Sequence, residues 1–200
     1  MEGFQGPVRH TGTMGTSLMA EVHESELIEG CVRGDKTAQR QLFDRYRDRV
    51  YSIALHYLRG DEAAALDVTQ DVFVKVFRAI GSFRQDARLS TWLYRVVANR
   101  CMDELRRSRR WLSFGDLPPA QHPRVSQDTH DELQPDVARA IQALSPKLRI
   151  VVLLRHFDDL SYDEIATTLG LSAGTVASRL SRAHASLARA LAHLKHESNA

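Results

Sequence analysis

The chain has 200 residues, 43% of them hydrophobic, which is enough for one or two domains with packed cores. Its formal net charge is only +2, but residues 88–110 hold seven arginines against two carboxylates, and residues 121–136 hold one arginine against four. Two isolated cysteines exclude a disulfide framework, and no signal peptide or membrane-spanning apolar run is evident. We therefore expect a cytoplasmic protein without membrane insertion, whose basic surfaces suit nucleic acid.

The first part of the chain changes from irregular to helical. Residues 1–23 lack hydrophobic periodicity and are predicted to form a disordered extension. Helical periodicity begins at Glu24 and predicts one short helix over residues 24–33 and a second over residues 36–58, ended by Gly34 and Gly60. The apolar stripe of the second helix consists of Phe43, Tyr46, Val50, Ile53 and Tyr57.

A third helix, predicted over residues 61–80, has two different faces. The apolar face consists of Val72, Phe73, Val76, Phe77 and Ile80. The other face carries Asp67, Gln70, Asp71 and Val74, for which the sequence indicates no internal partner. An exposed valine between carboxylates suits a docking surface for a basic partner helix. An ordinary solvated face is the alternative.

Residues 81–89 are predicted to form a loop, and Ser90 is expected to cap a fourth helix that ends near Arg110. Its polar face carries Trp92, Arg95, Asn99 and Arg106, and the loop before it contributes Phe83. Such a surface suits single-stranded DNA, because arginines contact phosphates, aromatic rings stack on bases and an amide binds a base edge. A structural tryptophan beside solvated arginines is the alternative.

Residues 111–135 hold four prolines and no apolar periodicity, which predicts a flexible interdomain linker with an acidic second half. Helical periodicity resumes near Val137. The pair Ser145-Pro146 then starts a helix that is expected to pack behind residues 160–184.

Residues 160–184 have the pattern of a helix-turn-helix. Ser161 and Glu164 predict a capping box for its first helix, which Gly170 can end by taking a positive φ. Ser172 is expected to cap the second helix, whose outer face carries Thr175, Ser178, Arg179, Ser181 and Arg182. Small polar and basic side chains suit the major groove of DNA, where arginines bind guanine or phosphate. A helical hairpin with a solvated basic face is the alternative.

Catalysis finds little support, because the sequence has no Gly-rich phosphate loop, no His/Cys metal cluster and no nucleophile elbow. His193 and His196 lie one turn apart, but two ligands without a third do not make a metal site. We therefore expect neither enzyme activity nor a metal or cofactor. The fold class expected is all-α, with two small helical domains joined by a flexible linker.

Three stretches resemble the bacterial sigma-70 family: DVTQDVFVKVFRAI, SFRQDARLSTWLYRVVANR and LSPKLRIVVLLRHFDDLSYDEIATTLGLSAGTVASRLSRA. They occur in the family's order, and the resemblance extends over residues 24–194. The chain is most similar to the extracytoplasmic-function group, which keeps only regions two and four. The resemblance implies a factor with region two at 24–110, a linker at 111–135 and region four at 136–196.

The partners that the resemblance implies are core RNA polymerase, through its β′ clamp helices and β flap, promoter DNA and an anti-sigma factor. The clamp helices would contact Asp67, Gln70, Asp71 and Val74. An extruded base of the melted −10 element would be held by Phe83, Arg95 and Asn99, with Trp92 in the segment associated with strand opening.

The −35 element would be bound by Ser178, Arg179, Ser181 and Arg182 on the second helix of the helix-turn-helix. Ala177 departs from the family pattern, because Lys or Arg is usual there, and His184 stands where an arginine is frequent. Both changes remove fixed positive charge, so we expect weaker or differently distributed −35 contacts.

Two other classes of protein remain as alternatives. A response-regulator-type transcription factor also ends in a helix-turn-helix, but it should begin with a βα receiver domain, and residues 24–110 show no strand pattern. A DNA recombinase or nuclease would need a nucleophile or a carboxylate cluster in its first domain, whereas Asp67 and Asp71 have no partners in the sequence.

Overall fold

The computed structural model describes residues 24–84, 88–114 and 133–192, and the predicted extension at 1–23, most of the linker, and His193 and His196 lie outside these ranges. A first helix spans residues 24–32. It is followed by α2 (Lys36–Tyr57), α3 (Glu62–Ala79), the 3₁₀ turn η1 (Ile80–Ser82) and α4 (Leu89–Phe114). The last elements are α5 (Pro135–Ala143), α6 (Pro146–Asp158), α7 (Tyr162–Leu169) and α8 (Ala173–Ala190). The prediction of an all-α fold is confirmed. None of the described helices combines the length and apolar character that crossing a membrane requires.

Short-range caps fix where α2 and α3 begin. The Asp35 side chain accepts a hydrogen bond from Thr37 N at 2.8 Å, and Asp61 accepts one from Ala64 N at 2.9 Å. Each bond satisfies a backbone N–H that the first turn of a helix leaves without an internal partner. Gly60, at a φ of 83°, makes the reversal between the two helices.

Helix α4 differs from its prediction at both ends. It begins at Leu89, so Ser90 lies inside the first turn and is not the cap. A carboxylate from far along the chain serves this end, because Glu24 Oε1 accepts from Leu89 N at 3.2 Å. The helix continues past Arg110 to Phe114, into the predicted linker, since no glycine or proline interrupts the sequence before residue 115.

The last two helices confirm the predicted helix-turn-helix. Ser161 and Glu164 form the capping box of α7, and Gly170 ends this helix with a φ of 64°. Ser172 caps α8 by accepting from Thr175 N at 3.2 Å. One face of α8 is buried through Val176, Leu180 and Ala183, and it packs on α6 and α7.

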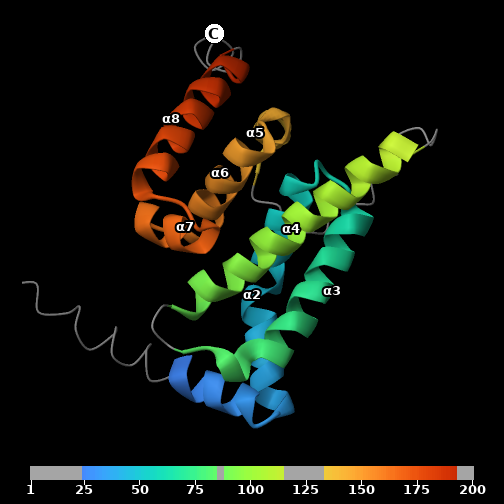
Figure 1. Cartoon of the computed structure of the whole chain (residues 1–200), viewed down its shortest axis with the longest axis vertical. Helices are drawn as coiled ribbons and strands as arrows, with labels where there is room; N and C mark the ends of the chain where they lie inside the picture. Colours follow the sequence, from blue (N-terminus) through green and yellow to red (C-terminus); the bar gives the residue numbers. More distant parts are fainter. Residues whose placement is uncertain (1–23, 85–87, 115–132, 193–200) are drawn as a thin grey trace, which may run out of the picture.

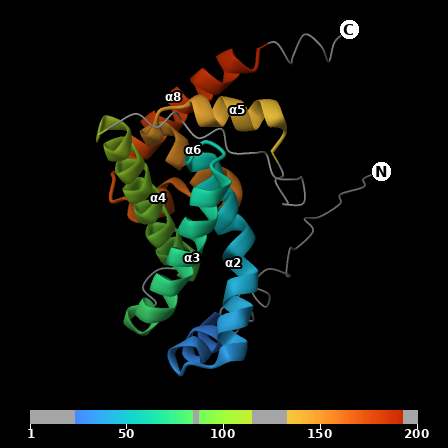
Figure 2. The same ribbon diagram turned by 90° about the vertical axis from the view of Figure 1, so that its right-hand side faces the viewer.

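The helices form two sets that lie against each other (Figures 1 and 2). Helices α2, α3 and α4 pack together, and α5 to α8 cover one side of them, with α6 against α2 and α7 against α4. A single cluster of buried apolar side chains runs through both sets. The predicted modules are therefore in direct contact, and α4 presents the side opposite α3 to the helix-turn-helix.

A buried arginine joins the two sets. Arg149 of α6 is fully buried and donates to Tyr57 O at the end of α2, and to Gln142 O and Leu144 O at the end of α5, at 2.5, 2.6 and 2.7 Å. The last carbonyls of a helix lack internal donors and carry partial negative charge. One guanidinium thus satisfies the ends of two helices from different parts of the chain.

Candidate docking face and nucleic-acid interface

The outer face of α3 brings together the four residues predicted to bind a partner. Asp67, Gln70, Asp71 and Val74 are all exposed, because the opposite side of the helix is buried in the core. Leu66 was missed by the sequence interpretation, and 60% of its surface is exposed, against 41% for Val74. Leu66, Gln70 and Val74 recur every four residues and so line one apolar-polar stripe beside the two carboxylates. That four-residue spacing is the signal that could have identified Leu66.

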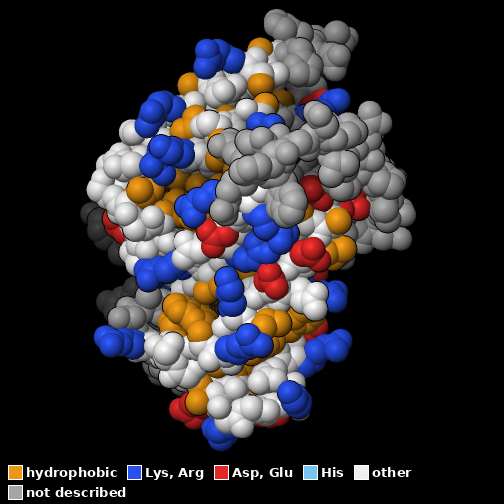
Figure 3. Space-filling view, turned by 45° about the vertical axis from the view of Figure 1, so that its right-hand side comes forward, with side chains coloured by type: hydrophobic (Ala, Val, Ile, Leu, Met, Phe, Trp, Pro, Cys, Tyr) orange, Lys and Arg blue, Asp and Glu red, His pale blue; other side chains and the backbone are white. Residues whose placement is uncertain are grey.

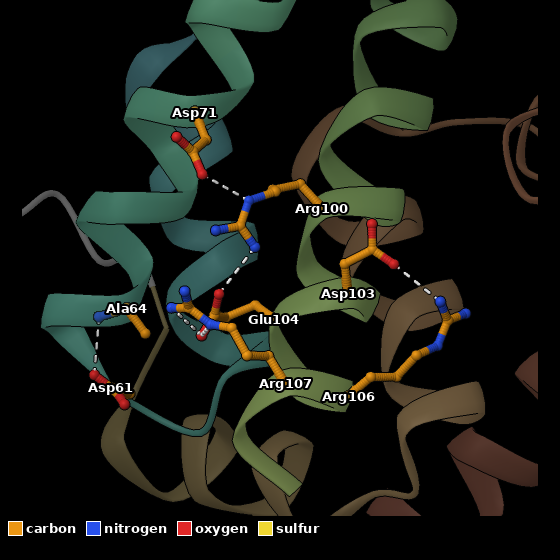
Figure 4. Close-up of polar contacts among 8 residues, drawn as sticks. All are labelled: Asp61, Ala64, Asp71, Arg100, Asp103, Glu104, Arg106 and Arg107. Atoms are coloured by element: carbon orange, nitrogen blue, oxygen red, sulfur yellow. Dashed lines mark hydrogen bonds and ion pairs between the residues drawn. The ribbon is translucent and has the colours of Figure 1, made fainter. Parts of the chain in front are cut away.

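Asp71 corrects the expectation that this face has no internal partner. Arg100 of α4 donates from Nε to Asp71 Oδ2 at 2.8 Å and from Nη1 to Glu104 Oε2 at 2.9 Å (Figure 4). Burial opposes the charged form of Arg100, but its bonds to Asp71 and Glu104 outweigh burial and raise the pKa of the guanidinium above its ordinary value. Asp67, in contrast, takes part in no ion pair within the described part of the chain.

Phe83 and Trp92, both predicted to act on melted DNA, lie against each other. Their ring centroids are 5.4 Å apart with planes tilted by 45°, and both rings pack on the hydrophobic core. This packing favours the alternative of a structural tryptophan. Each residue is only partly buried, so the pair also presents aromatic surface on which a base can stack.

Arg95, on the same helix, is engaged by the helix-turn-helix. Its guanidinium donates from Nη2 to Thr167 O of α7 at 2.8 Å. Two further contacts join these helices: Arg88 pairs with Glu164 at 3.5 Å, and Thr168 Oγ1 donates to the Thr91 carbonyl at 3.4 Å. The side of α4 that carries the predicted −10 residues is thus bonded to α7.

The two other polar residues of this set, Asn99 and Arg106, are exposed. Arg106 forms an ion pair with Asp103 at 2.9 Å, one turn back on α4. An exposed pair of this kind adds little to stability, so its guanidinium can change partners at small energetic cost.

The outer face of α8 carries the residues predicted to bind the −35 element. Ser178, Ser181 and Arg182 are exposed, whereas Thr175 and Arg179 are partly buried. Arg182 donates to the carbonyl and the hydroxyl of Ser178, each at 3.1 Å, so its guanidinium lies along its own helix.

Three further residues of α8 determine how much polar and charged surface this helix offers to DNA. The Thr175 hydroxyl lies 2.8 Å from the Ser172 hydroxyl and is therefore engaged in the cap. Ala177 is partly buried and His184 is exposed, so both residues that depart from the family pattern are accessible to solvent.

A hollow of about 330 Å³ lies between the two sets of helices. Its wall is mostly apolar, and Arg106, Lys147 and Arg179 add positive charge. One residue of the predicted −10 set and one of the −35 set thus line the same space. Figure 3 shows basic side chains spread from one end of the molecule to the other, with several acidic ones near the middle of that view and others toward its edges.

Two findings on the described residues concern metal binding and thiol chemistry. No group of three or more His, Cys, Asp or Glu side chains in these ranges is arranged to hold a metal ion. Burial raises the pKa of the Cys101 thiol to about 12, with a smaller opposing effect of Arg100, so this thiol stays protonated and unreactive. The receiver domain of a response regulator would contain strands, and residues 24–84 and 88–114 contain helices and their connections alone.

Comparison with known proteins finds two matching family descriptions: "Sigma-70 region 2" over residues 42–111 and "Sigma-70, region 4" over residues 135–187. The chain is 31% identical over 199 residues to the RNA polymerase sigma-H factor of Pseudomonas aeruginosa, covering 90% of this chain and 100% of that protein. It is 34% identical over 190 residues to the ECF RNA polymerase sigma factor SigM of Mycobacterium tuberculosis, covering 94% of each chain.

Two solved structures share the arrangement of the helices. CnrH in complex with the cytosolic domain of CnrY is 26% identical, with a TM-score of 0.64 over 85% of this chain and 97% of that one. The sigma factor RpoE of Bartonella quintana, in complex with the anti-sigma factor NepR, is 26% identical, with a TM-score of 0.62 over 76% of this chain and 95% of that one.

Proposed function

This chain belongs to the extracytoplasmic-function group of the sigma-70 family of RNA polymerase sigma factors, and we propose that it divides the work of such a factor between its two sets of helices. Residues 24–110 act as region two, docking on core polymerase and opening the −10 element. Residues 136–196 act as region four and bind the −35 element, and residues 111–135 link the two. The factor works in the cytoplasm by binding, without catalysis of its own.

The observation that carries this proposal is the exposed face of α3. Leu66 and Val74 are large apolar side chains exposed to solvent, and they flank Asp67 and Asp71 on a helix whose other face is fully buried. Apolar and acidic groups together suit a basic amphipathic partner, which steers to the carboxylates and buries the apolar side chains. The β′ clamp helices of core polymerase are that partner in our proposal, and its β flap receives region four.

Promoter opening requires a rearrangement of the contacts described above. Arg95 cannot bind a nucleotide and Thr167 O with the same donor, so this bond must open before Arg95 Nη2 contacts the −10 strand. The polar bonds between α4 and α7 are exposed or long, so breaking them costs little. We propose that core polymerase and DNA together supply the energy for it.

An anti-sigma factor is the third proposed partner. The sigma factor RpoE of Bartonella quintana, a relative of similar fold, was solved in complex with the anti-sigma factor NepR. Apolar surface with a cationic rim, as in the hollow between the two helical sets, suits an acidic amphipathic segment of a regulator.

The proposed docking is tested with Asp67→Arg. Asp67 is exposed and forms no ion pair within the described residues, so reversing its charge spares the fold but repels a basic partner. We expect loss of core polymerase in a pull-down and loss of promoter-directed transcription in vitro. Asp44→Arg is the matched control, because Asp44 is an exposed carboxylate on α2 that pairs with Arg40. Normal polymerase binding by Asp67→Arg, or equal loss with both variants, would refute the assignment.

A further inference from the structure

A row of four alternating charges runs from the docking face of α3 along α4: Asp71, Arg100, Glu104 and Arg107 (Figure 4). We call this row the charge ladder. Arg100 binds Asp71 at 2.8 Å and Glu104 at 2.9 Å, and Arg107 binds the other oxygen of Glu104 at 2.9 Å. The exposed fraction of the side chain falls from 53% at Asp71 to 13% at Arg100 and 5% at Glu104. The ladder is therefore buried in its middle and reaches the surface at both ends, at Asp71 and at Arg107, whose side chain is 58% exposed.

The inner members of the ladder determine what Arg100 can do. A carboxylate as buried as Glu104 is costly unless both oxygens are paired, and Arg100 and Arg107 meet that need. Glu104 in turn offsets the positive charge of Arg100 from within the protein. Arg100 holds Asp71 through Oδ2, and Oδ1 faces no competition from this guanidinium.

We propose that Arg100 is a positioning residue for polymerase docking, which fixes the Asp71 carboxylate in the orientation that the basic partner meets. This inference rests on the proposed docking role of α3. A free aspartate side chain on a helix surface samples several rotamers and loses that freedom when it is bound. Ordering one such side chain in advance improves affinity by about two- to tenfold. The bond between Arg100 and Asp71 also makes the docking face of α3 depend on α4, the helix that contacts the −10 strand in our proposal.

The test is a double-mutant cycle on the whole chain with core RNA polymerase. Wild type, Asp71→Ala, Arg100→Met and the double variant are compared by dissociation constant and by association and dissociation rates. We expect Arg100→Met to weaken binding by about two- to tenfold, mainly through faster dissociation, because positioning affects the bound state more than the encounter. In the Asp71→Ala background, Arg100→Met should have no further effect.

The matched control is Arg40→Met. Arg40 donates from Nε to Asp44 Oδ2 at 2.8 Å, the same pair of atoms at the same distance, but on the exposed surface of α2. This variant should bind polymerase as wild type does. Thermal unfolding of every variant identifies losses that come from stability alone.

Three outcomes decide the matter. Equal weakening by Arg100→Met with and without Asp71, or no weakening at all, overturns the positioning role and leaves docking intact. Wild-type binding by both Asp67→Arg and Asp71→Ala overturns the docking proposal and this inference with it. Should Arg100→Met fail to fold, because Glu104 loses a partner, Arg100→Met with Glu104→Gln removes both charges from the interior. This pair of changes must show the same faster dissociation, and wild-type dissociation from it overturns the proposal.

Discussion

Two arginines of α4 and two of α8 are held in different ways. On α4, Arg95 and Arg100 reach other helices, at Thr167 O and at Asp71, each at 2.8 Å. On α8, Arg182 and Arg189 donate to carbonyls four residues back on the same helix, at 3.1 and 3.3 Å. The first kind of bond depends on the tertiary fold, and the second forms wherever the helix forms.

This difference indicates how each surface can adapt to a partner. A guanidinium fixed between two helices presents a preset geometry, which changes only when the helices move. A guanidinium lying along its own exposed helix exchanges that bond for a phosphate or a base at little cost, since water competes for it already. Region two thus has a preorganised charged surface, whereas α8, the recognition helix of region four in our proposal, has an adaptable one.

The largest effect is expected where the two halves are joined. Arg149→Leu leaves the carbonyls at the ends of α2 and α5 buried without a donor, since the guanidinium serves Tyr57 O, Gln142 O and Leu144 O. We expect the free energy of unfolding to fall by about 3 kcal/mol or more, measured by urea denaturation.

Arg155→Leu is the control for that prediction. Arg155 also belongs to α6 and donates to two backbone carbonyls, of Asp159 and Leu160, at 2.8 and 3.0 Å, but it is exposed. Its replacement should lower the free energy of unfolding by about 1 kcal/mol or less. Equal losses for the two variants would show that burial of Arg149 does not join the halves.

A smaller effect is expected on the recognition helix, in promoter binding alone. Arg182→Ala should lower the affinity of the reconstituted holoenzyme for promoter DNA by about tenfold and reduce its salt slope by about one, if the side chain contacts a phosphate. Its unfolding free energy should change by less than about 0.5 kcal/mol, because the residue is exposed. Arg189→Ala removes the same kind of bond near the end of α8 and should leave promoter affinity unchanged. Loss of affinity in both variants, or in neither, would contradict an adaptable recognition surface centred on Arg182.

Features set by neighbouring residues could be predicted from the sequence. The capping box joins Ser161 to Glu164, and the Ser172 cap joins Ser172 to Thr175. Both link residues three positions apart, so both depend on local geometry alone. Ser90 failed as a cap because a distant residue took that place, since Glu24 lies 65 residues before Leu89. The all-α class and the helix-turn-helix could be predicted because both follow from patterns among neighbouring residues.

The candidate site was predictable in part for the same reason. The exposed face of α3 follows from helical spacing, but the partners of its charges do not. Arg100 lies 29 residues from Asp71, Arg95 lies 72 from Thr167, and Arg149 lies 92 from Tyr57. Arg149 in particular stands two residues after Lys147 at the start of an apolar run, and its burial depends on two helix ends that only the fold brings together.

The smallest effect concerns the contact between α7 and α4, and it depends on pH. The backbone N–H and hydroxyl of Ser161 donate to the Glu164 carboxylate at 2.8 and 2.7 Å, and with the nearby Arg88 they hold the pKa of this carboxyl below its ordinary value despite partial burial. A carboxyl whose pKa is lower in the folded state contributes stability above its unfolded pKa of about 4.3, and this contribution is lost as the pH falls through the folded value. Glu164→Gln should therefore lower the free energy of unfolding by about 0.5–1 kcal/mol at neutral pH, and by progressively less below about pH 4.

Glu29→Gln is the control for this titration, because Glu29 forms an exposed ion pair with Arg33 at 3.8 Å and caps no helix. We expect Glu29→Gln to change the free energy of unfolding by no more than a few tenths of a kcal/mol, roughly the same at neutral pH and below about pH 4. Raising the salt concentration should weaken the Arg88 contribution to the Glu164 effect but not the bonds from Ser161. A difference between wild type and Glu164→Gln that remained constant down to about pH 3 would contradict the ionised capping box. If that difference disappeared at high salt and neutral pH, the Arg88 pair between α4 and α7 would be its main source.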